Sequence, residues 1–417
     1  MKPNQTGRRG FLKLSSLGVA AASMHGMVPK RTKAAWTEGT EINPAIPNDR
    51  IVCCHDNAIF PGFPEDKDGA YGMRGGWPDG DDICNEGNCV TITKSLSGNP
   101  IDIPMNKARF EEQNTTLDAA RIESDLDACA QTLSGAGSAS AAWSTIFMKG
   151  EKDWSEITVA LTMDTQTLFP VHVPIVGKIC KVLIDLGVPA GNIMLYDGQG
   201  FLWDYENSEV VYGVPYLYED YVGNGIPEGV VLSSGFDALG GLTAAPVPEP
   251  FEGEYLCAKS IADGDIDIIV NLATNKSHGD LLNGAALCLY NHYGATFVRQ
   301  PRDVFEGIDI LNYMMAINKS EAVIGTAPAR QQLCIIDAMW GNHCCGPYGT
   351  HLGKYTIDRQ PNRLIMGTCA PLVDAVTIRK IRSQMAAHVL GFSQRFMVDF
   401  GYPGEKWDEL EFTMVNV

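Results

Sequence analysis

The clearest pattern in this chain is a run of apolar, largely β-branched residues at 266–272, followed at once by polar side chains. A continuous apolar run of this length is typical of a strand buried on both faces of a parallel sheet. Open α/β sheets bind their ligands beside the carboxyl ends of the strands. The pattern therefore predicts a central strand that ends in a candidate site. Its donors and acceptors are Asn271, Thr274, Asn275, Lys276, Ser277 and His278.

Strand-like and helix-like spacing alternate along much of the remaining chain. Thr115 and Asp118 form a helix-start signature, and apolar residues then recur on one helical face. This order predicts an α/β fold, a doubly wound and mostly parallel sheet with an N-terminal extension and a mid-chain insertion. The expected strands are 157–163, 193–196, 266–272, 334–337 and 364–367, and the expected helices are 173–186 closed by Gly187, 281–292, 308–317 and 373–390.

Shifts in composition divide the chain into segments. The α/β core is expected at 115–400, and its aromatic, Pro/Gly-rich stretch 201–257 is predicted to be an insertion at the mouth of the site. The extension is rich in Gly, Pro and Asp, but its large apolar side chains indicate that it folds over the core. The other predicted segments are a signal peptide at 1–34, the N-terminal extension at 35–114 and an acidic C-terminal tail at 401–417.

The first residues have the pattern of an export signal. Arg8 and Arg9 begin the sequence RRGFLK, and a weakly apolar run follows, as in a twin-arginine signal. The alternative is a basic, disordered N-terminus. The run is shorter than the roughly 20 residues that a permanent membrane anchor needs. We therefore predict a periplasmic or extracellular protein that meets the twin-arginine translocase during export and has no stable membrane anchor.

The charge of the chain limits its partners. The formal net charge is -18, and removal of residues 1–34, which hold seven basic and no acidic residues, changes it to -25. Such a protein repels nucleic acid and anionic membrane surfaces, so we expect no nucleic-acid partner. With 45% hydrophobic residues the chain can bury a large core.

Polar residues at the predicted strand ends form the first candidate site. Carboxylates and a histidine that meet at one sheet edge can hold a divalent cation or act as general acid and base. The alternative is that each Asp caps the next helix or turn. A small-molecule substrate is expected at this edge. The predicted catalytic residues are Lys276, His278, Asn271, Asp337 and Asp164.

Cysteines provide a second candidate site. The chain has twelve, and two adjacent pairs lie beside a histidine in near mirror image, as CCH and HCC. These side chains could ligate zinc, copper or an iron–sulfur cluster. The alternative is disulfide bonding in an oxidising compartment, including a bridge between the two pairs. The candidate metal ligands are Cys53, Cys54, His55, His343, Cys344 and Cys345, whereas Cys129, Cys180, Cys288, Cys334 and Cys369 are expected to be packed in the core.

Three segments in order, within roughly 143–387, resemble the uncharacterised protein family catalogued as domain of unknown function 362. They are a strand–helix unit with Asn271, Lys276, His278, Asn291, Tyr293 and Gly294, a helix–strand unit at 173–197, and a segment at 333–374 that contains CIIDAMWG. The resemblance implies association with iron–sulfur ferredoxin modules, although this chain has no C-x-x-C-x-x-C run. Ala273, Thr274 and Tyr290 replace a Pro and two Lys common in the family, which favours a less anionic ligand or one held by a metal.

Together these patterns predict an exported metal- or iron–sulfur-associated enzyme, redox in character, that acts on a small polar substrate at the carboxyl edge of the sheet. The cofactor is left open between a divalent metal and an iron–sulfur cluster. The alternative is a non-catalytic periplasmic binding or assembly protein braced by disulfides.

Overall fold

A computed structural model gives the fold. It describes residues 41–59, 115, 117–163, 171–198, 202–205, 208–211, 221–248, 253–276, 286–298, 310–325, 328–339, 361–382 and 409–417. The chain divides into two units, Met1–Lys33 and Ala34–Val417, and all the described residues belong to the second. The predicted signal peptide therefore lies outside the described residues, as does most of the N-terminal extension.

An eight-stranded sheet organises this unit, with strand order β12-β1-β11-β10-β9-β2-β3-β6. Every neighbouring pair is parallel except the two pairs made by β11, so β11 alone among these strands runs against the others. The strands are β1 (Ile51–His55), β2 (Val159–Met163), β3 (Ile193–Asp197), β6 (Val231–Ser234), β9 (Ile268–Thr274), β10 (Gln331–Ala338), β11 (Arg363–Gly367) and β12 (Phe412–Val415).

The order in which the chain fills the sheet is that of a doubly wound fold. From β2 it proceeds outward through β3 to β6, then returns to β9 on the other side of β2 and continues to β10. The direction of winding therefore reverses between β2 and β9, and this switch point is where such sheets bind ligands. The predicted α/β fold with a mostly parallel sheet is confirmed.

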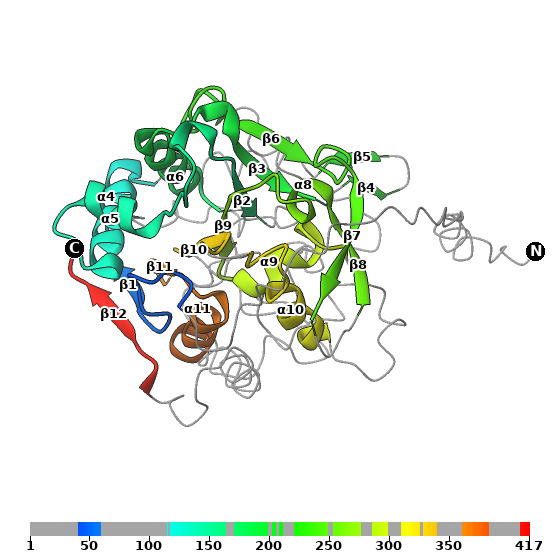
Figure 1. The fold of residues 1–417 in the computed structure, drawn as a ribbon. Helices are drawn as coiled ribbons and strands as arrows, with labels where there is room; N and C mark the ends of the chain where they lie inside the picture. The colour runs from blue at the N-terminus through cyan, green and yellow to red at the C-terminus, as the bar shows by residue number, and fades with distance from the viewer. Residues whose placement is uncertain are drawn as a thin grey trace, which may run out of the picture. The chain divides into compact units, whose positions relative to one another are not determined.

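Helices cover both faces of the sheet, as Figure 1 shows. Alternate residues of β9 point to opposite sides, so that Ile268, Val270 and Leu272 join one apolar cluster whereas Ile269 and Ala273 join the other. All seven residues of β9 are buried, as expected for the central strand. The first cluster includes α4 (Ala119–Ser134), α5 (Ala139–Ile146) and α6 (Val173–Leu186), and the second includes α9 (Cys288–Ala295), α10 (Ile310–Asn318) and α11 (Ala370–Thr377).

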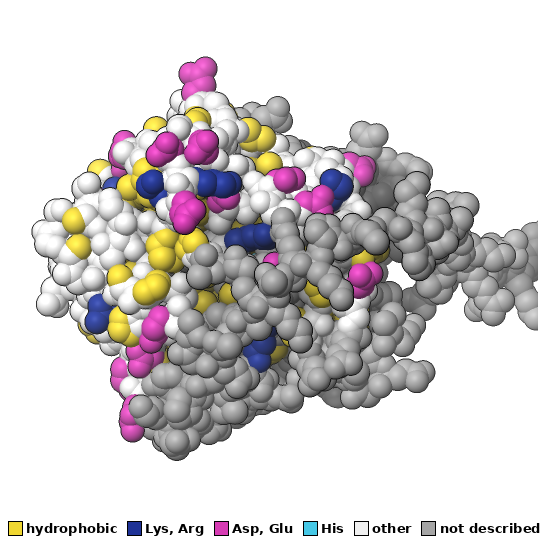
Figure 2. Space-filling view, viewed as in Figure 1, with side chains coloured by type: hydrophobic (Ala, Val, Ile, Leu, Met, Phe, Trp, Pro, Cys, Tyr) yellow, Lys and Arg dark blue, Asp and Glu magenta, His cyan; other side chains and the backbone are white. Residues whose placement is uncertain are grey.

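Local sequence sets the ends of the helices. Asp118 caps α4 by accepting a hydrogen bond from the backbone N–H of Arg121, and Gly187 ends α6 in the left-handed conformation at φ 108°. The range predicted for α6 is confirmed. Across this face Lys178 pairs with Asp127 at 2.8 Å and Lys181 with Glu123 at 2.6 Å, and acidic and basic side chains are accordingly interspersed there (Figure 2).

The region predicted as an insertion contributes to the main sheet as well as to small hairpins. Strand β6 lies at one edge of the main sheet, while β4 (Leu202–Tyr205) with β5 (Ser208–Val211), and β7 (Leu242–Val247) with β8 (Gly253–Ala258), form two-stranded sheets. A short helix, α8 (Lys259–Ala262), follows β8.

Both ends of the described chain also enter the main sheet. Strand β1 comes from the predicted N-terminal extension and lies between β11 and β12, and β12 comes from the predicted tail. The composition of the extension predicts a segment that folds over the core, whereas β1 is a strand of the sheet itself. The pairing of β1 with strands more than 300 residues away leaves no local sequence signal.

Candidate functional site

The switch point between β2 and β9 brings polar residues to the carboxyl edge of the sheet. Thr274 ends β9 and lies beside Asp337 of β10 in the parallel register, so both side chains point to the α6 face. The backbone N–H of Asn275 donates to the carbonyl of Asp337 at 2.9 Å, which joins the two strand ends. The structure therefore places Asp337 at this edge, as predicted.

Asp337 forms a pair with a histidine that the sequence analysis did not select. Its Oδ2 atom lies 2.5 Å from Nδ1 of His172 and accepts the backbone N–H of the same residue at 3.0 Å. Its Oδ1 atom accepts the N–H of Met339 at 3.2 Å. Both side chains of the pair are buried, at 3% and 1% exposure. Asp337 thus fixes the imidazole of His172 at the N-terminus of α6.

The tautomer of His172 follows from this contact. A carboxylate only accepts hydrogen bonds, so Nδ1 of the ring carries the proton that it donates to Asp337. Nε2 is then the ring nitrogen that Asp337 does not engage. An imidazole held by a carboxylate in this way is the base–orienter arrangement of many hydrolytic and proton-transfer sites.

A buried hydroxyl lies at the same edge. Thr274 is 5% exposed, and its Oγ1 atom makes no hydrogen bond with any residue that the structure describes. An unsatisfied buried hydroxyl costs free energy unless a ligand or water completes it. Water or a polar group of a ligand can complete it, and it lies beside Asp337 at the strand ends.

Lys276 is fully buried just beyond the end of β9. Its Nζ atom lies 5.7 Å from the centroid of the Tyr290 ring, on the side of α9. The aromatic face stabilises a cation at this distance. Lys276 thus lies at the predicted edge of the sheet. Its side chain extends toward the face opposite to the one that holds His172 and Asp337.

The contacts of Asn271 are structural. Its Nδ2 atom donates to the carbonyl of Cys288 and to Oε1 of Gln331, both at 2.9 Å, and its Oδ1 atom accepts from Asn291 at 2.8 Å. Both amide hydrogens and the amide oxygen are therefore used within the core. These bonds hold β9, β10 and α9 together and leave Asn271 no group for a substrate.

His292 extends the same buried network. Nε2 lies 2.7 Å from Oε1 of Gln331 and Nδ1 lies 2.9 Å from the hydroxyl of Thr296, which in turn contacts the hydroxyl of Tyr196 at 2.7 Å. Burial lowers the pKa of His292 to about 4, although the bond to Gln331 acts in the opposite direction. His292 is consequently a neutral, structural histidine at physiological pH.

A buried carboxylate fixes the start of α9. Asp374 of α11 accepts the backbone N–H groups of Cys288 and Leu289 at 3.0 and 2.9 Å. Burial raises its pKa to about 7, while these two hydrogen bonds lower it. This capping from a distant helix explains why α9 starts at Cys288, several residues later than the predicted 281.

The candidate metal ligands of β1 do not converge. Cys53 and Cys54 alternate in the strand, so they belong to the two apolar clusters on opposite faces of the sheet, and His55 is exposed. Within the described ranges no group of three or more His, Cys, Asp or Glu side chains is placed to hold a metal ion. His343, Cys344 and Cys345 lie outside these ranges, as do Asp164 and His278.

All eight described cysteines are free thiols, and all are buried. Cys53 and Cys54 are among them, so neither forms the disulfide bridge that we had considered. The burial expected for Cys129, Cys180, Cys288, Cys334 and Cys369 is confirmed. Burial raises the pKa of Cys180 and of Cys257 to about 12, which keeps these thiols protonated and unreactive.

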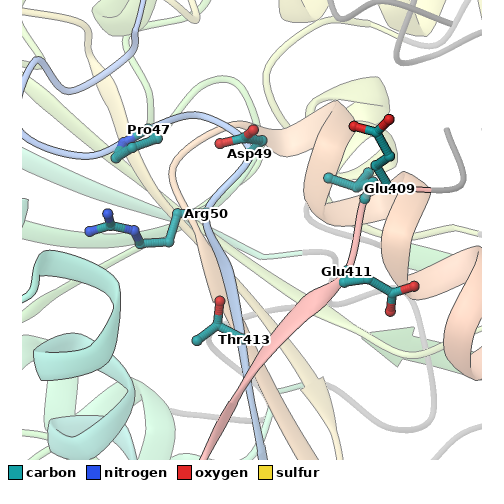
Figure 3. A pocket seen from close by; sticks show the side chains of 7 residues that line it. Pro47, Asp49, Arg50, Glu409, Glu411 and Thr413 are labelled. Carbon is teal, nitrogen blue, oxygen red and sulfur yellow. The ribbon is translucent and has the colours of Figure 1, made fainter. Parts of the chain in front are cut away.

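A surface hollow of 280 Å³ lies elsewhere, beside β1 and β12 (Figure 3). It is lined by Pro47, Asp49, Arg50, Glu409, Leu410, Glu411 and Thr413. Its charged residues are partly engaged already, since Arg50 donates to the carbonyl of Leu133 at 3.1 Å and Glu411 pairs with Arg379 at 3.1 Å. The hollow contains none of the predicted site residues, so we place the candidate site at the switch point.

No helix in the described ranges is long and apolar enough to cross a membrane. Comparison of the chain with protein-family models, with curated proteins and with solved structures gave no match.

Proposed function

We propose that this protein is an exported enzyme that acts on a small polar substrate by general acid–base catalysis at the carboxyl edge of its sheet. The buried His172–Asp337 pair is the observation that carries the proposal. His172 would exchange a proton with the substrate through Nε2, and Asp337 would act as the positioning residue that fixes the tautomer and stabilises the imidazolium.

Two neighbouring groups support a ligand at this position. The unsatisfied hydroxyl of Thr274 can bond to a polar atom of the substrate. Lys276 lies two residues beyond the end of the same strand, and its side chain extends toward the opposite face of the sheet, so it would serve an anionic group only of a substrate that reaches across the edge. His278 and Asp164 complete the set that we predict for the edge, on the basis of their places in the sequence.

The proposed export rests on the signal-like N-terminus, RRGFLK, with the twin-arginine translocase as transient partner. This route carries proteins that have already folded in the reducing cytoplasm. The eight buried free thiols suit it, because a chain that enters an oxidising compartment unfolded exposes its cysteines to oxidation. The resemblance to the family catalogued as domain of unknown function 362 remains part of the same proposal.

Metal or iron–sulfur chemistry remains a separate prediction. It requires ligands from His343, Cys344 and Cys345, and Cys53 and Cys54 can contribute at most one side chain to any one ion, because they point to opposite faces of β1. Metal analysis of protein purified without oxygen tests this prediction independently of the acid–base site.

A ligand screen tests the proposed function. The mature protein is mixed with a library of small carboxylates, phosphates and polyols, and each compound that raises Tm is assayed for turnover. We expect at least one compound to stabilise the wild type and to be converted, and H172Q and K276M to reduce both effects. His55→Gln and Lys178→Met are matched controls, because His55 is exposed and Lys178 pairs with Asp127 away from the edge.

The possible outcomes separate the alternatives. Binding that depends on Lys276, but without turnover of any compound, supports the non-catalytic binding protein. Binding and turnover that are the same in H172Q, K276M and the two controls would place the site elsewhere and overturn the proposal.

A further inference from the structure

A chemically reactive pair of residues lies in a surface turn that packs against α6. Asn224 and Gly225 are both exposed, in the turn between Tyr221 and Ile226. The backbone N–H groups of Asn224 and Ile226 donate to the carbonyl of Tyr221 at 2.8 and 3.0 Å. The N–H of Gly223 donates to the carbonyl of Ile226 at 2.7 Å, which closes the turn. Asn224 is therefore presented to water on a turn that its backbone bonds hold in place.

The packing of this turn requires a glycine directly after Asn224. Gly225 has a φ of 102°, in the region that residues with a side chain rarely adopt. A Cβ atom added to it would lie 2.9 Å from Cγ1 of Val173, the first residue of α6. The carbonyl oxygen of Gly225 also comes so close to Gly177 that a Cβ atom added there would lie 2.1 Å away. The contact with α6 thus keeps an Asn–Gly pair at the surface.

An Asn that precedes a Gly is prone to deamidation within the chain. The backbone nitrogen of the Gly attacks Cγ of the Asn side chain, a C–N bond forms, and ammonia leaves, so that a cyclic succinimide remains. Water then opens the ring to give Asp or isoAsp, and in isoAsp the backbone runs through the side-chain carbon. Glycine favours the reaction because it has no Cβ atom to obstruct its nitrogen. The reaction needs water but no oxidant or metal.

Both reacting groups are available in the turn. Neither the backbone N–H of Gly225 nor the side-chain amide of Asn224 makes a hydrogen bond with any residue that the structure describes. Asn192 provides a contrast, because its Nδ2 atom donates to the carbonyls of Ser155 and Ile157 at 3.4 and 3.2 Å. The β-branched residue that follows Asn192 also restricts the approach of the backbone nitrogen.

We propose that Asn224 is a site of spontaneous deamidation, and that its conversion to isoAsp loosens the contact between this turn and α6. The isoAsp product adds a methylene group to the backbone immediately before Gly225, and it adds a negative charge. The carbonyl of Gly225 then leaves the position in which it fits against Gly177. Close-packed contacts of this kind do not absorb such a displacement without loss of stability.

The modified turn contacts the end of α6 that belongs to the proposed site. Gly225 packs on Val173, and Val173 directly follows His172. We therefore expect deamidation to disturb the position of His172 as the protein ages. This last step rests on the proposed function, whereas the modification and its effect on stability do not.

Peptide mapping of the full mature protein tests the modification. The folded protein is held at pH 8 until a free peptide of residues 221–230 has been converted, and is then digested and analysed by mass spectrometry that distinguishes isoAsp from Asp. We expect Asn224 to show the mass change of an amide that becomes an acid, and Asn192 to stay intact. The other Asn–Gly pair of the sequence, Asn283–Gly284, lies outside the described residues and is read from its own peptide. An Asn224 that stays intact in the folded protein would overturn the proposal.

Thermal unfolding of the same samples tests the coupling to α6. We expect the aged wild type to have a lower Tm than fresh protein, in proportion to its isoAsp content. Asn224→Gln is the matched control, because the longer side chain forms the ring far more slowly, and its Tm should not change during the incubation. It retains Asn283, so it also accounts for any change there. A wild type that contains isoAsp at position 224 but keeps its original Tm would contradict the coupling, and neither measurement depends on a substrate.

Discussion

At the scale of single residues, buried polar side chains separate into those with every group engaged and those with a group left over. Asn271 and Asp374 belong to the first kind, since each of their bonds ends on the core or on a helix terminus. Thr274 belongs to the second. The distinction matters because a fully engaged polar group stabilises the fold, whereas an unsatisfied one indicates where a ligand can bind.

Replacing Asn271 by Leu should therefore reduce stability without acting on catalysis directly. The substitution removes the bond to the carbonyl of Cys288 and one bond each from Gln331 and Asn291, at a cost of about 3 kcal/mol. Urea denaturation measures this loss. A variant that is as stable as the wild type but inactive would show that Asn271 serves the site after all.

The buried carboxyl group of Asp374, which holds the start of α9, should make stability depend on pH. Its pKa in the folded protein is raised to about 7, so its contribution is present at low pH and falls as the pH rises toward 7. Asp374→Asn should remove this fall, because the amide oxygen stays neutral while it accepts a backbone N–H. Unfolding curves at pH 5 and pH 8 suffice, and an equal decline in both proteins would contradict the assignment.

At the scale of elements, repetitive patterns were predictable and long-range pairings were not. The apolar run at 266–272 predicted β9 to within two residues, and the helical spacing that ends at Gly187 predicted α6. His172 was missed because the residue that it pairs with, Asp337, is 165 residues away in the sequence. A histidine two residues before a proline that opens a helix was the available signal.

Helix α6 also depends on a glycine for its close approach to the loop at 221–226. A Cβ atom added at Gly177 would lie 2.1 Å from the carbonyl oxygen of Gly225, far inside any normal contact. We expect Gly177→Ala to cost about 2 kcal/mol or more, as overpacking does. Gly191→Ala, where no atom lies within 4 Å, is the control for thermal unfolding. Equal Tm values for the two variants would show that α6 is not packed so closely.

At the scale of the whole molecule, the doubly wound sheet accounts for where the polar residues gather. The parallel pairing of β9 with β10 brings Thr274 and Asp337 together at the carboxyl edge, while β1 and β12 extend the sheet beyond β11. The sequence predicted the core strands and this edge. It could not predict that segments near both ends of the chain join one sheet, because parallel pairing of β1 and β12 has no local signature.

The oxidation state of the thiols tests whether the protein folds before it is exported. If the protein folds before export, the eight cysteines found free should remain reduced in the mature protein. Thiol titration should then detect at least these eight in denaturant and almost none of them in the native state, because burial protects them. A substantially lower count in denaturant would mean that the chain was oxidised before or during folding.

The most direct test of the central claim is the rate at which H172Q converts the substrate found by the ligand screen, measured against the wild type and H55Q at equal fractions folded. Loss of the general base should lower kcat by roughly a hundredfold or more, with a smaller effect on KM, while H55Q stays at the wild-type rate. If H172Q retains the wild-type kcat, His172 is a structural cap of α6 and the protein's chemistry lies elsewhere.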